Sequence, residues 1–169
     1  MDYNFINSEA HEITDFQYFK KLLKEGWTAT RTYGQFARYD ATATNGKREL
    51  IVEYKGRDNT VLTDTIKAEG AIIDCDKVDY MLSTGKQGVI VLFFIEDNVT
   101  YVWDIKDSVN WKKGLKQTRK NNYSDEKGTD MVYYMPFNEE NARYTVDLTH
   151  YKEDLEENKQ KLTQLHEND

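Results

Sequence analysis

The dipeptide Asn45-Gly46 is the feature of this sequence that most restricts how the chain can fold. It lies between two runs with strand-like residue patterns, 36–44 and 47–55. Asn-Gly is a strong signal for a two-residue β-hairpin, because both residues accept the positive φ angles that such a turn needs. We therefore expect an antiparallel ribbon here, with a further strand before it at 27–33.

The length of this turn sets which side chains share a face of the ribbon. A two-residue loop pairs Thr44 with Lys47. Counting outward from this pair places Asp40 opposite Ile51. Because side chains alternate along a strand, Glu53 lies on the face of Ile51 and becomes the diagonal neighbour of Asp40, at roughly 7 Å between backbones. Two carboxylates are thus expected to converge.

Asp40, Glu53 and Lys55 together suit metal-assisted hydrolysis. Mg2+ takes oxygen ligands, commonly one or two carboxylates with water and substrate phosphate at about 2.1 Å, and Mn2+ is the expected substitute. Lys55 would lie beside such an ion, where its ammonium can hold a phosphate or stabilise charge in the transition state. These three are the candidate catalytic residues, with Asp40 and Glu53 as metal ligands. Arg38, opposite Glu53 in this register, offers the alternative of a plain cross-strand ion pair.

Two amphipathic helices are expected around the ribbon. Residues 8–25 carry apolar side chains at spacings of three and four, and Gly26 ends the pattern. Ser8 is one candidate N-cap and the capping-box signal at 14–17 is another, so two starting points stay open. A second helical stripe covers 65–82.

The rest of the chain adds strands and a terminal helix to a single domain, 1–169. Residues 88–95 form an almost unbroken apolar run, which is typical of a central strand buried on both faces. An alternating strand is expected at 99–105, and 106–130 is a polar, basic segment. Two edge strands and an acidic helix are expected after it, at 131–136, 143–148 and 150–166.

Composition narrows the class of protein. The single cysteine, Cys75, excludes an internal disulfide and a Cys-rich zinc cluster, and it fits a reducing cytoplasm. The first ten residues lack the basic-then-apolar pattern of a signal peptide, and the apolar run 88–95 is too short to cross a bilayer as a helix. We expect an intracellular, cytoplasmic protein without a membrane segment.

The net charge of −7 argues against binding nucleic acid through bulk electrostatics. Basic residues are nevertheless concentrated in one stretch, which makes it a candidate phosphate-binding loop: Lys112, Lys113, Lys116, Arg119 and Lys120. A solvated surface loop is the plainer interpretation of such a run.

The order helix, strand, strand with Asp, strand with Glu-x-Lys, helix, strand resembles the PD-(D/E)xK nuclease superfamily. In this sequence the motif reads Arg-Tyr-Asp at 38–40 and Val-Glu-Tyr-Lys at 52–55, with Tyr39 where the eponymous proline would stand. The resemblance covers roughly 8–105. It implies a restriction-endonuclease-like fold, α+β with a mixed central sheet flanked by helices, and Mg2+-dependent cleavage of DNA.

The same resemblance implies two accessory positions. In the superfamily the first helix often supplies a further acid, here Glu9 or Glu12, and the second helix a polar residue near the site, here Lys67 or Glu69.

Two functions follow as hypotheses. The first is a metal-dependent nuclease that hydrolyses nucleic acid, with DNA the expected substrate; cutting both strands of a duplex favours a homodimer. The second is a catalytically silent nuclease-fold protein that binds a protein partner, which the acidic net charge favours. DNA or RNA, and endonuclease or exonuclease, stay open.

Overall fold

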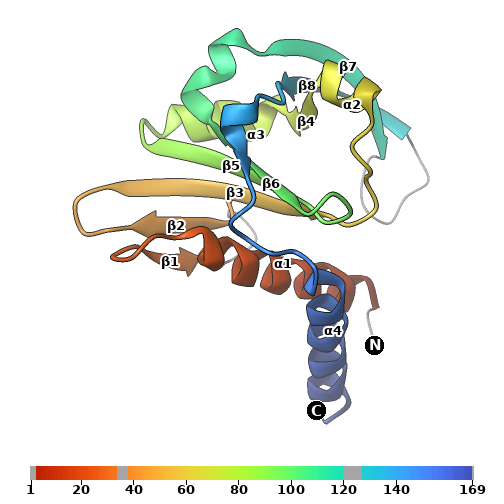
Figure 1. Ribbon diagram of the computed structural model, residues 1–169. Coiled ribbons are helices and arrows are strands. Elements are labelled where there is room, and N and C mark those ends of the chain that lie inside the picture. The colour runs from red at the N-terminus through yellow and green to blue at the C-terminus, as the bar shows by residue number, and fades with distance from the viewer. Residues whose placement is uncertain (1–2, 34–37, 120–126, 169) are drawn as a thin grey trace.

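The computed structural model describes residues 3–33, 38–119 and 127–168, and it has three layers (Figure 1). A six-stranded mixed sheet forms the middle layer. Two long helices cover one of its faces, and a three-stranded sheet with two short helices covers the other. This arrangement confirms the predicted α+β class with a mixed central sheet flanked by helices.

The central sheet consists, in spatial order, of β1 (Thr28–Arg31), β2 (Ala41–Thr44), β3 (Glu49–Arg57), β5 (Gln87–Phe94), β6 (Val99–Asp104) and β9 (Ala142–Arg143). β3 and β5 are parallel, and the other neighbours are antiparallel. The predicted central strand at 88–95 is confirmed as β5, whose side chains pack into the cores on both faces.

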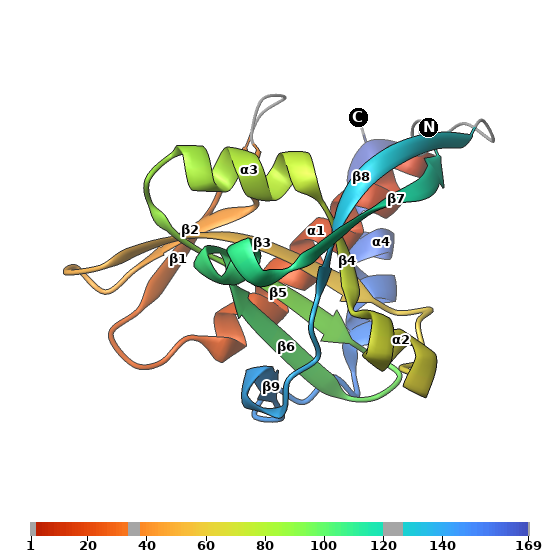
Figure 2. The ribbon, with the colours of Figure 1, turned by 90° about the horizontal axis from the view of Figure 1, so that it is seen from above.

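The second sheet consists of β4 (Ala71–Asp74), β8 (Lys127–Met135) and β7 (Lys112–Arg119), all antiparallel, with β8 in the middle. Seen from above, the β7–β8 hairpin crosses over the central sheet (Figure 2). A 3-10 helix, η1 (Ile105–Asn110), connects β6 to β7.

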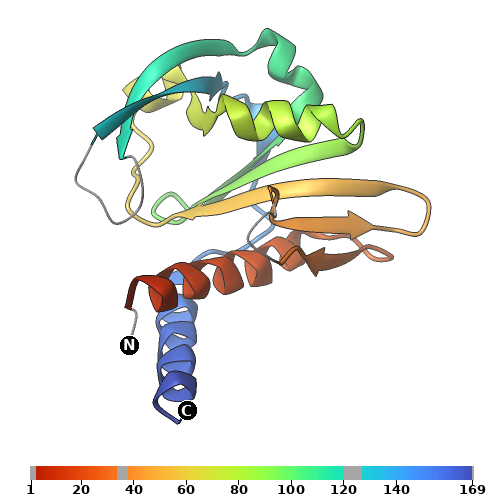
Figure 3. The ribbon, with the colours of Figure 1, turned by 180° about the vertical axis from the view of Figure 1, so that it is seen from behind.

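The helices are α1 (Tyr3–Leu22), α2 (Asp64–Glu69), α3 (Cys75–Ser83) and α4 (Tyr151–Glu167), with a short 3-10 turn, η2 (Glu139–Asn141), before β9. α1 lies along the underside of the central sheet (Figure 3), and α4 packs against α1 from its first turn, where Tyr18 donates to Asp154, to its last, where His166 contacts Phe5. The predicted terminal helix at 150–166 is confirmed as α4.

The hairpin at Asn45-Gly46 has a longer loop than the sequence predicted. Thr44 pairs with Glu49, not with Lys47, so the pairing is shifted by two residues. The Asn45 side chain causes this, because its Oδ1 accepts the N–H groups of both Lys47 and Arg48, at 2.9 and 2.7 Å, and holds these residues in the turn. A shift of two leaves every side chain on its predicted face.

The predicted helix at 65–82 is wrong, because a strand interrupts it. α2 ends at Gly70, whose φ of 107° takes the chain out of the helix. The apolar residues at 71–73 then pair with β8 as strand β4 before α3 begins. Pairing with a distant strand overrode the local helical pattern, which runs without a break through this segment.

Three predictions for the second half of the chain need correction. The polar segment 106–130 is not a surface loop in its described part, since it contains β7 and the start of β8. The strand predicted at 131–136 as an edge strand belongs to β8, in the middle of its sheet. The strand predicted at 143–148 is much shorter: β9 consists of Ala142 and Arg143, and its pairing with β6 stops there.

The first helix begins earlier than either predicted start, at Tyr3, and ends before Gly26 as expected. Its buried face is also rotated from the predicted stripe: Thr14, Asp15 and Tyr18 are buried and Ile13 is only half-buried. The reason is that α4 packs against this face and supplies hydrogen-bond partners for its polar residues, as in the bond from Asn158 Nδ2 to Thr14 Oγ1 at 2.9 Å.

None of the helices in the described residues combines the length with the apolar composition that a membrane-spanning segment needs.

Candidate active site

The site lies at the open edge of β3, beyond the point where β2 ends. The last backbone bond between these strands runs from the Asp40 N–H to the Val52 carbonyl at 2.8 Å. Continuing the observed pairing by one residue sets Asp40 opposite Glu53. The side chains of Glu53, Lys55 and Arg57 follow on one face of β3 as it continues beside β5.

Asp40 and Glu53 form a carboxyl pair in which Glu53 is buried and Asp40 is half-buried. The Glu53 residue is 8 % exposed, and Asp40 Oδ2 accepts the N–H of Tyr54 at 2.9 Å. Burial, followed by the negative charge of Asp40, raises the pKa of Glu53 to about 7. Burial also raises the pKa of Asp40, although the Tyr54 N–H opposes the shift. The two carboxyl groups are in hydrogen-bond contact, so near neutral pH they are placed to share one proton.

Lys77 is the residue of this site that the sequence did not reveal. It lies in the first turn of α3, and its Nζ forms an ion pair with Glu53 Oε1. Its side chain is 49 % exposed, so the ammonium reaches the pair from the solvent side. The interruption after Gly70 creates the helix start from which Lys77 projects, and the predicted continuous helix concealed that start.

Lys55 and Arg57 continue the row of side chains from Glu53. Partial burial lowers the pKa of Lys55, and the positive charges of Arg57 and Lys77 lower it further. Burial likewise lowers the pKa of Arg57. Lys77 thus contacts Glu53 directly from α3, and the positive charge of Lys55 on β3 acts on both carboxyl groups.

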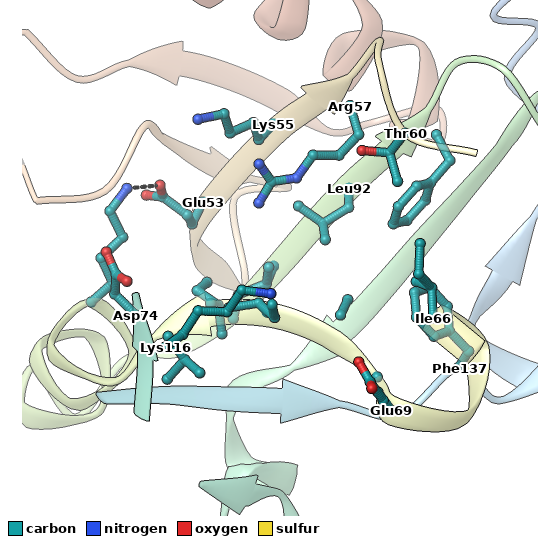
Figure 4. Close-up of a pocket in the computed structure, with 18 of the residues that line it drawn as sticks. Glu53, Lys55, Arg57, Thr60, Ile66, Glu69, Asp74, Leu92, Lys116 and Phe137 are labelled. Atoms are coloured by element: carbon teal, nitrogen blue, oxygen red, sulfur yellow. Dashed lines mark hydrogen bonds and ion pairs between the residues drawn. The ribbon is translucent and has the colours of Figure 1, made fainter. Parts of the chain in front are cut away.

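Two hollows meet at this row. The inter-sheet cavity, of about 470 Å3, lies between the central sheet and the three-stranded sheet (Figure 4). The helix-side hollow, of about 560 Å3, is lined by α1 and by the end of β3. Both are lined by Glu53, Lys55, Arg57, Thr60 and Lys77. Glu53 is therefore accessible from both hollows, whereas Asp40 lines only the helix-side hollow.

In each of the two pairs of accessory candidates, one residue lines a hollow and the other does not. Glu12 lines the helix-side hollow and its pKa is raised by burial and then by the charge of Asp40, whereas Glu9 does not line it. Both acids bind Arg31, at 3.1 and 3.2 Å. Glu69 lines the inter-sheet cavity, at some distance from Glu53 in Figure 4, and Lys67 lines neither hollow.

The basic stretch contributes one lysine to the site. Lys116, on β7, lines the inter-sheet cavity opposite β3. Lys112 and Lys113 are exposed elsewhere on the strand, and the Lys113 Nζ lies 5.1 Å from the centre of the Tyr133 ring. Lys120 and the side chain of Arg119 lie outside the described residues.

The carboxyl pair fits a divalent cation as a two-ligand site. In the described part of the chain, no three His, Cys, Asp or Glu side chains gather as a metal centre. An ion would therefore depend on Asp40 and Glu53 with water and substrate oxygens, which is an arrangement that Mg2+ accepts. Two neighbouring carboxyl groups are suitable ligands, because a cation relieves the repulsion between their negative charges. The ammonium of Lys77 already supplies one positive charge to Glu53.

The chain matches no protein-family model and no curated protein sequence. Among solved structures, the chain is similar to the 1.6 Å structure of Archaeoglobus fulgidus Hjc, a Holliday junction resolvase from an archaeal hyperthermophile. The match covers 70 % of this chain and 82 % of the resolvase chain. The sequence identity is 17 % and the TM-score is 0.36. The likeness is distant, so the functional proposal rests on the geometry of the chain itself.

Proposed function

We propose that this protein is a metal-dependent nuclease that hydrolyses phosphodiester bonds, in DNA in the first place, with Mg2+ as its ion and Mn2+ as a substitute. The observation that carries the proposal is the pair of Asp40 and Glu53 at the open edge of β3, with Glu53 buried and ion-paired to Lys77 and with Lys55 on the same strand face. The order of Asp40, Glu53 and Lys55 along the chain, which resembles the PD-(D/E)xK motif, supports it.

Each residue of the site has a distinct role in this proposal. Asp40 and Glu53 would hold the ion, which supplies positive charge that polarises the phosphate and acidifies a bound water. Lys55 lies on the same strand face with a lowered pKa, and it holds the scissile phosphate or orients the attacking water. Lys77 positions the Glu53 carboxylate through its ion pair.

The direct test is cleavage of labelled DNA and RNA, single-stranded and duplex, with Mg2+ and with Mn2+. We expect Asp40→Asn and Glu53→Gln to abolish cleavage, and Lys55→Met to lower the rate about 100-fold to 1000-fold, the usual effect of removing one group that stabilises transition-state charge. Glu49→Gln is the matched control, because Glu49 is an exposed acid on the same strand; its rate should stay at the wild-type value. Wild-type protein inert on all four substrates would contradict the proposal.

Metal binding is measured separately from cleavage. Titration calorimetry with Mn2+ should detect a site in the wild type that Glu53→Gln weakens and Glu49→Gln preserves. Loss of the heat in Glu53→Gln with an unchanged circular dichroism spectrum would assign the ion to the carboxyl pair and not to the acidic surface.

One observation favours the second function, a catalytically silent protein that binds a partner. Lys77 forms an ion pair with Glu53, so the protein itself supplies a positive charge at the position where a cation would bind. The acidic net charge of −7 points the same way. A wild-type protein that gives no Mn2+ heat and cuts no substrate would favour this alternative.

A further inference from the structure

Arg57 is a charged residue that the proposed chemistry does not use. It ends β3, is half-buried, and lines both hollows. Among the described residues its guanidinium has no hydrogen bond and no ion pair. Asp15 and Asp74 are near enough to act on it electrostatically, but burial outweighs them and its pKa is lowered. A partly buried cation without a partner is costly, which indicates that it serves to bind an anion.

Lys116 approaches the same space from the opposite wall. It projects from β7 into the inter-sheet cavity and has no ion-pair partner in the described part of the chain. Figure 4 shows the Arg57 and Lys116 side chains both extending into the cavity, from β3 and from the sheet that covers it, with Thr60 beside Arg57. Two unpaired cations and a hydroxyl thus line one small volume.

The size of this volume restricts the anion. At about 470 Å3 the cavity is within the range that holds drug-sized ligands, roughly 300–1000 Å3. A nucleotide is a ligand of this size and a duplex is not. Residues of the three-stranded sheet line the cavity opposite β3, so Arg57 and Lys116 face one another across a space with walls on both sides, which suits a single strand better than a double helix.

We propose that Arg57 and Lys116, assisted by Thr60, bind a phosphate of an unpaired nucleotide, so that the substrate of this site is a single-stranded segment or a frayed end. Arg57 lies two residues beyond Lys55, about 7 Å along the strand. The phosphate that it binds is therefore a neighbour of the phosphate at the carboxyl pair, along the same nucleic-acid backbone. This inference deepens the proposed nuclease function and names its substrate class.

The test measures binding alone. A short fluorescent single-stranded oligodeoxynucleotide, its ribonucleotide counterpart and the matching blunt DNA duplex are titrated with protein in EDTA at fixed ionic strength, and anisotropy is recorded. We expect both single strands to bind more tightly than the duplex. Arg57→Gln and Lys116→Gln should each weaken single-strand binding about tenfold, the usual effect of losing one hydrogen bond between charged groups.

Lys112→Gln is the matched control, because Lys112 is an exposed lysine on the same strand as Lys116 and lies outside the cavity. It removes the same charge and should change binding less than twofold. Equal loss in all three variants would show bulk electrostatics and overturn the inference. Equal affinity for the duplex and the single strands would overturn the inference too. So would a wild-type protein that binds neither the DNA nor the RNA single strand.

The two proposals fail in different ways. Binding that depends on Arg57 and Lys116, in a protein that cuts nothing with either metal, would support the phosphate subsite and contradict the nuclease. Titration of Lys116→Gln with Mn2+ should give the same heat as the wild type, because Lys116 is not one of the proposed metal ligands. Lys116 is exposed, so its variant tests the inference even if Arg57→Gln fails to fold.

Discussion

Glu53 is a buried acid between a like charge and an opposite one, and this position sets how it titrates. Burial and Asp40 favour its protonated form, while the ammonium of Lys77 favours the carboxylate. The first two effects prevail, so the pKa of Glu53 rises from 4.5 to about 7. The folded state therefore binds the proton of Glu53 more tightly than the unfolded chain does.

This titration predicts a pH dependence of stability. Without divalent metal, the contribution of Glu53 is fully present below pH 4.5 and is lost as the pH rises to about 7. The free energy of unfolding of the wild type relative to Glu53→Gln should therefore fall across this window, by an amount on the order of a few kcal/mol. Urea unfolding of both proteins in EDTA measures it.

Lys77→Met provides the internal control for this measurement. Removal of its attraction raises the pKa of Glu53 further, so the upper end of the window should move to higher pH. A difference between wild type and Glu53→Gln that is independent of pH would contradict the assignment of a raised pKa to Glu53.

Two features allow β3 to carry the site. On one side β2 ends before Glu53, which leaves that edge of β3 open, and on the face below α1 and α4 come close to the strand. Gly56 permits the close approach: a Cβ at this position would lie 2.7 Å from Asp15 Oδ1 and closer still to the Tyr151 hydroxyl. The Tyr151 hydroxyl donates a hydrogen bond to Asp15 Oδ1, and this bond joins α4 to α1 beneath the strand. The glycine between Lys55 and Arg57 thus allows the helical layer to support the strand that carries the candidate site.

Gly56→Ala should destabilise the protein by about 1–3 kcal/mol, because the added methyl group overpacks this contact. Chemical denaturation measures the loss, and circular dichroism checks that the fold persists. Tyr151→Phe removes the nearest oxygen, so the double variant should be less destabilised than the sum of the two single variants. Strict additivity would show that the methyl group is accommodated elsewhere.

At the scale of the whole molecule, the C-terminal segment completes the lower layer. Leu148 lies in the chain between β9 and α4, and it is fully buried with Val146 and Tyr151 in the core under the central sheet. Its N–H donates to Asn98 Oδ1 at 2.8 Å, which fixes the segment to the β5–β6 turn. α4 is thereby directed onto α1.

Leu148→Ala should cost about 2–5 kcal/mol of unfolding free energy, the usual effect of a cavity in a closed core. Leu165→Ala makes the same chemical change at a leucine on α4 that is 64 % exposed, and it should stay within about 0.5 kcal/mol of the wild type. Urea denaturation compares them. Equal effects would mean that the segment before α4 is not part of the core.

Local patterns were enough to predict β5, β6, α4 and the shared face of Asp40 and Glu53. The shared face was predicted from an incorrect register and still holds, because side-chain direction repeats every two residues and the observed shift is two. Such features depend on backbone geometry within a few residues of each other, and sequence spacing expresses them directly.

Lys77 and Lys116 reach the site only through contacts between distant segments. β4 pairs with β8, more than fifty residues away, and this pairing breaks the apparent helix and sets the start of α3. The same small sheet carries β7 across the central sheet and brings Lys116 into the cavity. Pairing between distant strands depends on competing long-range packing energies, and no spacing within one segment records which partner prevails.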